Sequence, residues 1–217
     1  MIRTVDLEEH QRKEVMASLV QDVGAYTVLR EEKVGATIGG ELITNAVLAL
    51  VVSWGLIILY VAYRFEWRFG VSAVLALVHD IIIVLAVFSL TQRQIDSSFI
   101  AALLTIVGYS INDTIVIFDR IRENLKLHFR RGGDVNELVN RSIYQTLTRS
   151  LYTVFTVLFT TFALYWFGGE TTKDFAFALL VGFASGCYSS IFIASQLWIE
   201  LRNRMERSFT VQKTAEG

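Results

Sequence analysis

Hydrophobic side chains fill five long stretches of the chain, and short segments rich in charge separate them. The stretches are approximately Ala46 to Tyr63, Val71 to Leu90, Phe99 to Phe118, Leu151 to Phe167 and Phe175 to Trp198. Each has close to the roughly 20 helical residues needed to cross a hydrocarbon core of about 30 Å. The pattern predicts an all-α membrane domain over residues 46–198, built from five transmembrane helices.

The first 45 residues show a different pattern, without an apolar span. Leu7 to Val20 places Val15 and Leu19 on one helical side, whereas Tyr26 to Val34 has the character of a strand. One helix and one strand cannot bury a core alone. We therefore expect residues 1–45 to be a small α+β remnant of an exported domain that continues in a longer polypeptide or packs against a partner. The opening residues have no apolar core, so no cleaved signal peptide is expected.

The segment between the third and fourth spans has the pattern of two helices joined by a turn. Arg120 to Arg131 extends the third span until a pair of glycines stops it. Asp134, with Glu137 three residues later, resembles a capping box that starts a helix over Val135 to Arg149. We expect residues 119–149 to form a helical loop along the inner membrane surface.

Composition and charge support a membrane protein and set its expected orientation. The chain is 53% hydrophobic and 19% charged, and its mean hydropathy is +0.46, which is too apolar for an ordinary soluble domain. Arg93 and Lys173 are the basic residues of the two short loops on one side, whereas the loops on the other side are rich in Lys and Arg. The positive-inside rule then predicts a cytoplasmic C-terminal tail, residues 199–217, and an N-terminal segment outside.

Asp113 stands inside the third span, where a charged carboxylate needs a physical reason. An ionised Asp near the centre of a membrane helix costs about 2.5 to 3.5 kcal/mol on insertion scales, so the side chain is expected to face protein or water. Tyr109 and Ser110 lie one turn back and could bond on the same side, Asn112 is its neighbour, and Gly108 would let another helix approach closely. The sequence leaves open a proton-carrying role and a simple interhelical hydrogen bond.

His79 and Asp80 form a second polar pair near the middle of the second span. Adjacent helical residues point about 100° apart, so the two side chains are expected to contact different neighbours. A histidine at this depth could relay protons, but a neutral imidazole bonded to another helix would serve structure alone. Both interpretations remain open from the sequence.

Two further spans carry regular patterns of their own. On the fourth span, one cation and three hydroxyls share a stripe, which we call the hydroxyl stripe: Arg149, Thr153, Thr156 and Thr160. Its arginine could contact lipid headgroups or approach Asp113. On the fifth span, small residues recur every four positions and predict a helix-packing face, which we call the packing ridge: Ala178, Gly182, Gly186, Ser190 and Ala194. Cys187 is the only cysteine, so no disulfide can form within the chain.

These residues carry a resemblance to a known family. VGYSINDTIVIFDRIREN, Val107 to Asn124, preceded by ALLT, resembles the signature span of SecF, the smaller half of the SecDF protein-translocation complex. VGATIGGEL from Val34, LVHD from Leu77 and NRSIYQTLTRS from Asn140 resemble other parts of it, and the similarity runs from about Val34 to Arg204. The chain departs from the family at Ala36, where proline is usual, and lacks the family's first span and most of its exported domain.

The resemblance implies a subunit of the bacterial inner (plasma) membrane, related to the resistance-nodulation-division transporters. Such a subunit would work with SecD, the SecYEG channel and YajC to draw unfolded polypeptide across the lipid bilayer, with the proton as coupling ion and no other cofactor. Nucleic acid is not an expected partner. Asp113 would be the proton-carrying carboxylate and Arg149 its accompanying arginine. We place the remaining polar residues of the second and third spans in the same candidate relay: Asn112, Tyr109, Ser110, His79 and Asp80.

Two other classes of function remain compatible with the sequence. A proton-coupled transporter of small solutes would use the same buried carboxylate, and a purely structural subunit would use its polar spans to dock a partner. An enzyme is not expected, because the sequence has no Walker motif, no cluster of metal ligands and no sign of a catalytic arrangement.

Overall fold

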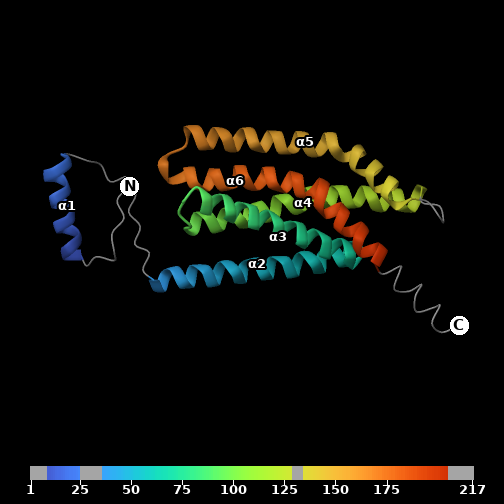
Figure 1. Ribbon diagram of the computed structural model, residues 1–217, viewed down its shortest axis with the longest axis horizontal. Helices are drawn as coiled ribbons and strands as arrows, with labels where there is room; N and C mark the ends of the chain where they lie inside the picture. Colours follow the sequence, from blue (N-terminus) through green and yellow to red (C-terminus); the bar gives the residue numbers. More distant parts are fainter. Residues whose placement is uncertain (1–8, 25–35, 129–133, 205–217) are drawn as a thin grey trace. The chain divides into compact units, whose positions relative to one another are not determined.

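The computed structural model describes residues 9–24, 36–128 and 134–204 of the chain, and the helices in these ranges are long (Figure 1). The helices are α1 (Glu9–Val23), α2 (Ala36–Arg64), α3 (Trp67–Leu90), α4 (Ser97–His128), α5 (Val135–Phe167) and α6 (Glu170–Tyr188), followed by the π-helical segment η1 (Ser189–Ala194). The chain stays helical after η1, so the last span runs over Thr172–Arg204. Within these described ranges, five helices are long and apolar enough to cross a membrane, which confirms the all-α prediction. The predicted strand, Tyr26 to Val34, lies outside the described residues.

The chain divides into two compact units, residues 1–47 and 48–217. In the first unit, α1 is a 15-residue helix of mostly polar sequence. The apolar side chain of Val20 on this helix is half exposed, so the described part of this unit buries little. The second unit holds the membrane-spanning bundle and every intramembrane carboxylate discussed below.

Helices α3, α4 and α6 form the inner part of the bundle, and α6 contacts all of α3, α4 and α5. About half of the residues are buried in the most apolar part of α3 (50%) and of the last span (56%), against 17% in α5 and 6% in α2. Helices α2 and α5 therefore expose most of their surface to lipid or to other chains. Figure 1 shows α5 and α2 on opposite sides of the other three.

Aromatic packing holds the inner helices together at two levels. The Phe69 ring on α3 stacks on Trp198 at 4.7 Å between centroids and packs on Phe118 at 4.8 Å. At the other end of the bundle, the rings of Phe88 and Phe99 join α3 to α4 at 4.4 Å. Because lipid is as apolar as these side chains, their stabilising effect comes from close packing more than from removal of water.

The packing ridge of the last span lies against α4, and all five of its residues are buried. A Cβ atom added to Gly182 would lie 2.2 Å from Cδ1 of Ile106, and one added to Gly186 would lie 3.1 Å from Cβ of Ser110. These glycines let the two helices approach closely. Gly108 differs, because it is exposed and no atom of the described chain lies within 4 Å of a Cβ built there. The expected close approach at Gly108 is therefore not made by the described residues.

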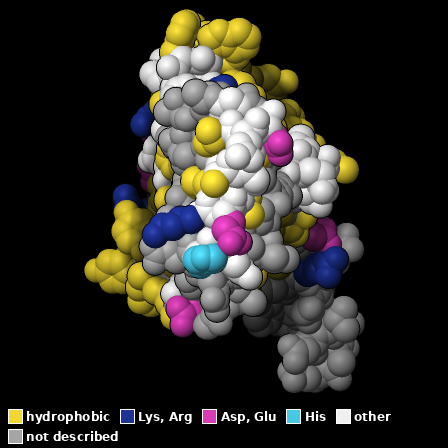
Figure 2. All heavy atoms as spheres, turned by 90° about the vertical axis from the view of Figure 1, so that its left-hand side faces the viewer, with side chains coloured by type: hydrophobic (Ala, Val, Ile, Leu, Met, Phe, Trp, Pro, Cys, Tyr) yellow, Lys and Arg dark blue, Asp and Glu magenta, His cyan; other side chains and the backbone are white. Residues whose placement is uncertain are grey.

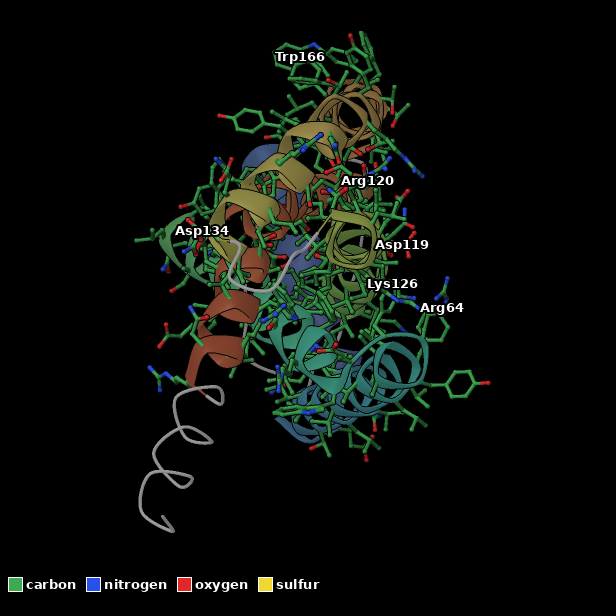
Figure 3. All side chains as sticks on the ribbon, turned by 90° about the vertical axis from the view of Figure 1, so that its right-hand side faces the viewer. Arg64, Asp119, Arg120, Lys126, Asp134 and Trp166 are labelled. Atoms are coloured by element: carbon green, nitrogen blue, oxygen red, sulfur yellow. The ribbon has the colours of Figure 1, made fainter. Side chains whose placement is uncertain are left out.

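At one end of the bundle α4 continues past its apolar part and the start of α5 packs on this extension. Asp134 caps α5, because its side chain accepts a hydrogen bond from the backbone N–H of Asn136 at 2.8 Å. Asn124 of α4 donates to Ser142 at 2.7 Å and to Gln145 at 2.9 Å. The segment that we expected as a surface helix is thus the first part of a continuous 33-residue helix, held against α4. Figure 3 shows charged side chains at this end, among them Asp119, Arg120, Lys126 and Arg64.

Helix α5 carries a row of exposed aromatic side chains, which we call the aromatic face: Tyr144, Tyr152, Phe155, Phe159, Phe162 and Trp166. Phe155 stacks on Phe159 and Phe162 on Trp166, with centroids 6.2 and 6.1 Å apart. Figure 2 shows hydrophobic side chains at the top of the molecule, where α5 lies in Figure 1, and in Figure 3 Trp166 points outward. An apolar surface of this size suits lipid or another protein chain.

Candidate functional site

Asp113 is buried on α4, with 7% of its surface exposed, and makes one hydrogen bond. The hydroxyl of Ser150 on α5 donates to Oδ1 of Asp113 at 2.5 Å. The other oxygen, Oδ2, is buried and has no hydrogen-bond partner among the described residues. A carboxylate can accept about four hydrogen bonds, and burial of one with so few donors is costly. The site therefore suits a group that takes up a proton or meets a donor from another chain.

The neighbours of Asp113 on α4 point in different directions. The Tyr109 ring packs on Phe183 of α6 at 4.6 Å between centroids, and Asn112 is exposed. Ser110, which we expected to bond on the same side as Asp113, instead donates to Asp80 of α3 at 2.8 Å. That expectation was wrong because Ser110 and Asp113 face different neighbouring helices.

The hydroxyl stripe of α5 lies on the outward side of the helix. Thr153 and Thr156 donate to the backbone carbonyls of Arg149 and Thr153 at 3.0 and 2.8 Å, and Thr160 donates to that of Thr156 at 3.3 Å. Arg149 is exposed and forms no ion pair with Asp113 within the described part of the chain. Ser150, the residue after this arginine, is the one that reaches Asp113. The stripe thus presents a cation and hydroxyls to whatever covers this side of α5.

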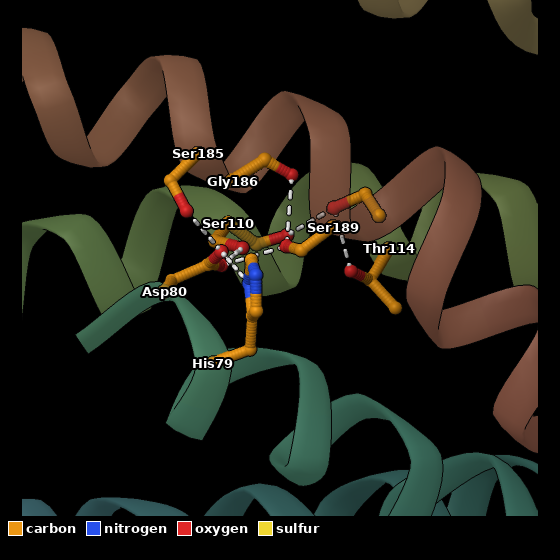
Figure 4. A network of polar contacts seen from close by, with 8 residues as sticks. His79, Asp80, Ser110, Thr114, Ser185, Gly186 and Ser189 are labelled. Atoms are coloured by element: carbon orange, nitrogen blue, oxygen red, sulfur yellow. Dashed lines mark hydrogen bonds and ion pairs between the residues drawn. The ribbon is translucent and has the colours of Figure 1, made fainter. Parts of the chain in front are cut away.

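Asp80 forms the centre of a second buried site, the Asp80 cluster, which consists of His79, Asp80, Ser110, Ser185 and Ser189 (Figure 4). Ser110 and Ser189 each donate to Oδ2 of Asp80 at 2.8 Å. Ser185 donates to Oδ1 at 2.8 Å, and Nδ1 of His79 lies 3.3 Å from the same oxygen. Asp80 is fully buried, and hydroxyls from two other helices surround it. Its acceptor capacity is therefore nearly filled, in contrast to that of Asp113.

His79 lies at the edge of this cluster, in a groove of about 450 Å³ between α3 and α6. The groove is lined by His79, Ile83, Val181, Ala184, Ser185 and Tyr188. About a third of the His79 side chain is exposed, whereas that of Asp80 is buried. The two neighbours thus face different surroundings, as expected from their helical positions, although their side chains also touch each other.

Sequence reasoning missed four polar residues that make these contacts. Ser150 holds Asp113, Ser185 and Ser189 hold Asp80, and Thr114 pairs with Ser190 at 2.8 Å. The four-residue spacing of Ser185 and Ser189 inside an apolar span was a usable signal, because it places both hydroxyls on one side of the helix. The described residues contain no group of His, Cys, Asp and Glu that could hold a metal ion.

Comparison with known proteins agrees with this architecture. Residues 15–204 match the family model described as protein export membrane protein SecD/SecF, C-terminal. The chain is 51% identical to the protein translocase subunit SecF of Acidaminococcus fermentans over 207 residues, covering 95% of this chain and 70% of that protein. It is 48% identical to the protein translocase subunit SecDF of Thermus thermophilus over 94% of its own length, but spans only 27% of that longer protein.

A solved structure shows the same fold. The crystal structure of SecDF, a translocon-associated membrane protein from Thermus thermophilus, superposes with a TM-score of 0.83 at 49% identity, over 91% of this chain and 27% of that one. A SecF from Vibrio alginolyticus is 45% identical, and the chain spans 64% of it. With this coverage and identity, the chain belongs to the SecD/SecF family of protein-export membrane proteins, and within that family to the SecF proteins.

Proposed function

We propose that this chain is the membrane part of a SecF subunit that acts with SecD to couple proton flow to the export of polypeptide. Its relatives are named protein translocase subunits, and the Thermus thermophilus relative is named SecDF. The observation that carries the proton role is Asp113, a buried carboxylate with one hydrogen-bond donor and one oxygen without a partner among the described residues.

Protonation of Asp113 would change how α4 and α5 fit together. In the charged form the carboxylate accepts a hydrogen bond from the hydroxyl of Ser150 and draws other donors toward Oδ2. In the neutral form the cost of burying a charge disappears and the carboxylic acid can donate a hydrogen bond itself. The relative stability of two arrangements of these helices would then change as Asp113 gains or loses a proton, and the exported domain would move with the helices.

The energy of the proton gradient is sufficient for such a switch. One charge moving through 100 mV supplies about 2.3 kcal/mol. Each unit of pH difference adds about 1.4 kcal/mol. Moving a two-state element from 1:99 to 99:1 takes about 5.5 kcal/mol. Two or three protons per stroke would therefore be enough.

The outward side of α5 is where we place SecD. Arg149 is exposed there beside the threonines of the hydroxyl stripe, and a cation facing lipid alone would be unfavourable. A neighbouring chain could use this stripe and supply a donor to Asp113. We further propose that the exported polypeptide comes from the SecYEG channel, with YajC as an additional partner.

The test compares the full-length subunit carrying Asp113→Asn with the natural protein, each copurified with SecD and placed in liposomes. The expected result is intact copurification with loss of proton flux and of gradient-dependent export. The matched control is Asn112→Asp, which places a carboxylate at the exposed neighbouring position and should not restore flux to Asp113→Asn. Normal export by Asp113→Asn would refute the proton role.

A second candidate, a purely structural docking subunit, is favoured by the exposed aromatic face and hydroxyl stripe of α5. On that view Asp113→Asn should weaken binding of SecD or leave both binding and export unchanged. Loss of flux with normal binding separates the two functions. A flux of small solutes through the liposomes would instead favour a transporter.

A further inference from the structure

Asp80 is a second buried carboxylate, and the mechanism based on Asp113 assigns it no role. It belongs to α3, while the hydroxyls that hold it come from Ser110 on α4 and from Ser185 and Ser189 on the last span. One side chain therefore ties three helices together in the middle of the bundle. His79 is the titratable side chain that contacts Asp80 among the described residues.

Further buried hydrogen bonds join α4 to the last span. Thr114 and Ser190 share a hydrogen bond of 2.8 Å, and Ser190 also lies 3.4 Å from the backbone carbonyl oxygen of Ser110. One turn before Ser190, Gly186 brings the last span close to Ser110. Asp80, Ser110, Ser189 and Ser190 are almost completely buried. Water cannot readily replace these bonds, so this contact is expected to resist opening.

The π-helical segment η1 begins within this set of bonds. Ser189 and Ser190 are its first two residues, and they bond to Asp80 on α3 and Thr114 on α4 respectively. A π-helical turn widens the helix and changes the direction of successive side chains, and such turns are rare and frequently occur at functional sites. Here the wider turn coincides with two consecutive serines whose hydroxyls bond to two different helices, α3 and α4. The π-helical backbone thus lets Ser189 bond to Asp80 while Ser190 bonds to Thr114.

Helix α5 is attached in a different way. It buries few residues, and its threonines at 153, 156 and 160 bond to its own backbone. Within the described bundle, the bond from Ser150 to Asp113 is the side-chain hydrogen bond that joins the spanning part of α5 to α4. Helix α5 also packs against α6 and α4, but its polar attachment to α4 in the spanning part depends on the carboxylate that the proposed function lets gain and lose a proton.

We infer that Asp80 is a positioning residue that holds α3, α4 and the last span together as one rigid body, against which α5 moves. This inference rests on the proposed function for the cause of the movement, because the change begins at Asp113. It assigns different roles to the two intramembrane carboxylates. Asp113 switches the contact with α5, and Asp80 keeps the other contacts of α4 fixed while that happens.

Reversible disulfides test which contact must move. In a full-length Cys187→Ala background, Thr114→Cys with Ser190→Cys bridges α4 to the last span, where the two hydroxyl oxygens are 2.8 Å apart. Asn124→Cys with Ser142→Cys bridges α4 to α5, where the bonded atoms are 2.7 Å apart. Each variant is compared with itself before and after reduction, in complex with SecD, so effects of the substitutions themselves cancel.

Oxidation should stop export in the α4–α5 variant, with recovery on reduction, and should leave export unchanged in the variant that bridges α4 to the last span. Inhibition by the bridge to the last span would overturn the inference, and so would unchanged export with α4 bridged to α5. Both outcomes can be read whether or not Asp113 carries the proton, because the locks report movement alone.

Rescue separates positioning by Asp80 from proton transfer by Asp80. Asp80→Asn turns one acceptor into a donor, so it should loosen the cluster and lower export severalfold. Oxidising Thr114→Cys with Ser190→Cys in this variant should restore part of the export, because the bridge keeps α4 against the last span even though the bonds of Asp80 from α3 are weakened. A proton carrier could not be replaced in this way, so a failure of rescue in a folded, SecD-bound Asp80→Asn variant would contradict the positioning role.

Discussion

The hydroxyl of Ser150 donates a hydrogen bond to Oδ1 of Asp113 at 2.5 Å and thereby joins α5 to α4. Among the described residues, side-chain hydrogen bonds join the same two helices again at one end of the bundle, where Asn124 donates to Ser142. A change in the charge of Asp113 would act first on this contact. The serine is therefore as informative a position as the carboxylate itself.

Ser150→Ala should reduce gradient-driven export, because it removes the only donor to Asp113 among the described residues. A hydrogen bond to a charged group contributes about 1.5 to 3 kcal/mol, so the effect should be large. Export into membrane vesicles at a fixed proton gradient measures it. Ser150→Thr keeps the hydroxyl and should retain most of the activity; equal activity of the alanine and threonine variants would argue against the contact.

Arg149→Gln should lower export while leaving the unfolding temperature of the isolated subunit unchanged. The reason is that Arg149 is exposed and forms no ion pair with Asp113 within the described chain, so the substitution removes no ion pair of the described bundle, whereas the proposed function places this charge beside SecD. Thermal unfolding in detergent and export in vesicles give the two measurements. Lys126→Gln, which removes an exposed charge from the extension of α4, is the matched control and should change neither.

Gly182→Ala should destabilise the bundle by roughly 1 to 3 kcal/mol, the usual effect of overpacking. The added Cβ would lie 2.2 Å from Cδ1 of Ile106, and α6 would have to shift away from α4. Gly108→Ala is the control on the same type of residue, because nothing in the described chain lies within 4 Å of its Cβ position. Unfolding in a denaturant series compares the two, and equal stabilities would mean that the ridge does not seat α6 on α4.

Phe69→Ala should destabilise the isolated subunit by roughly 3 kcal/mol, because the buried ring packs against both Trp198 and Phe118. Phe159→Ala, at an exposed position of the aromatic face, should leave that stability almost unchanged. If the aromatic face contacts SecD, Phe159→Ala should instead weaken copurification. Unfolding of the subunit alone and copurification of the pair separate these effects, and a large loss of stability for Phe159→Ala would place that ring inside the bundle.

The sequence by itself determined the features that depend on local order along the chain. Hydropathy located the five spans, Asp134 was recognised as the cap of α5, and the four-residue spacing of small residues marked the side of the last span that lies against α4. These features follow from the length of a membrane helix, the unpaired N–H groups at a helix start and the period of the α-helix.

Only the tertiary structure decided which polar groups meet. Ser110 and Asp113 are three residues apart on one helix, yet Ser110 bonds to Asp80 and Asp113 accepts from Ser150. The sequence also did not predict the π-helical segment at Ser189, because the chain has no proline that would indicate a distorted helix. The physical reason is that partners across helices depend on crossing angles and axial offsets, which are set by the packing of many side chains together and not by the period of any one helix.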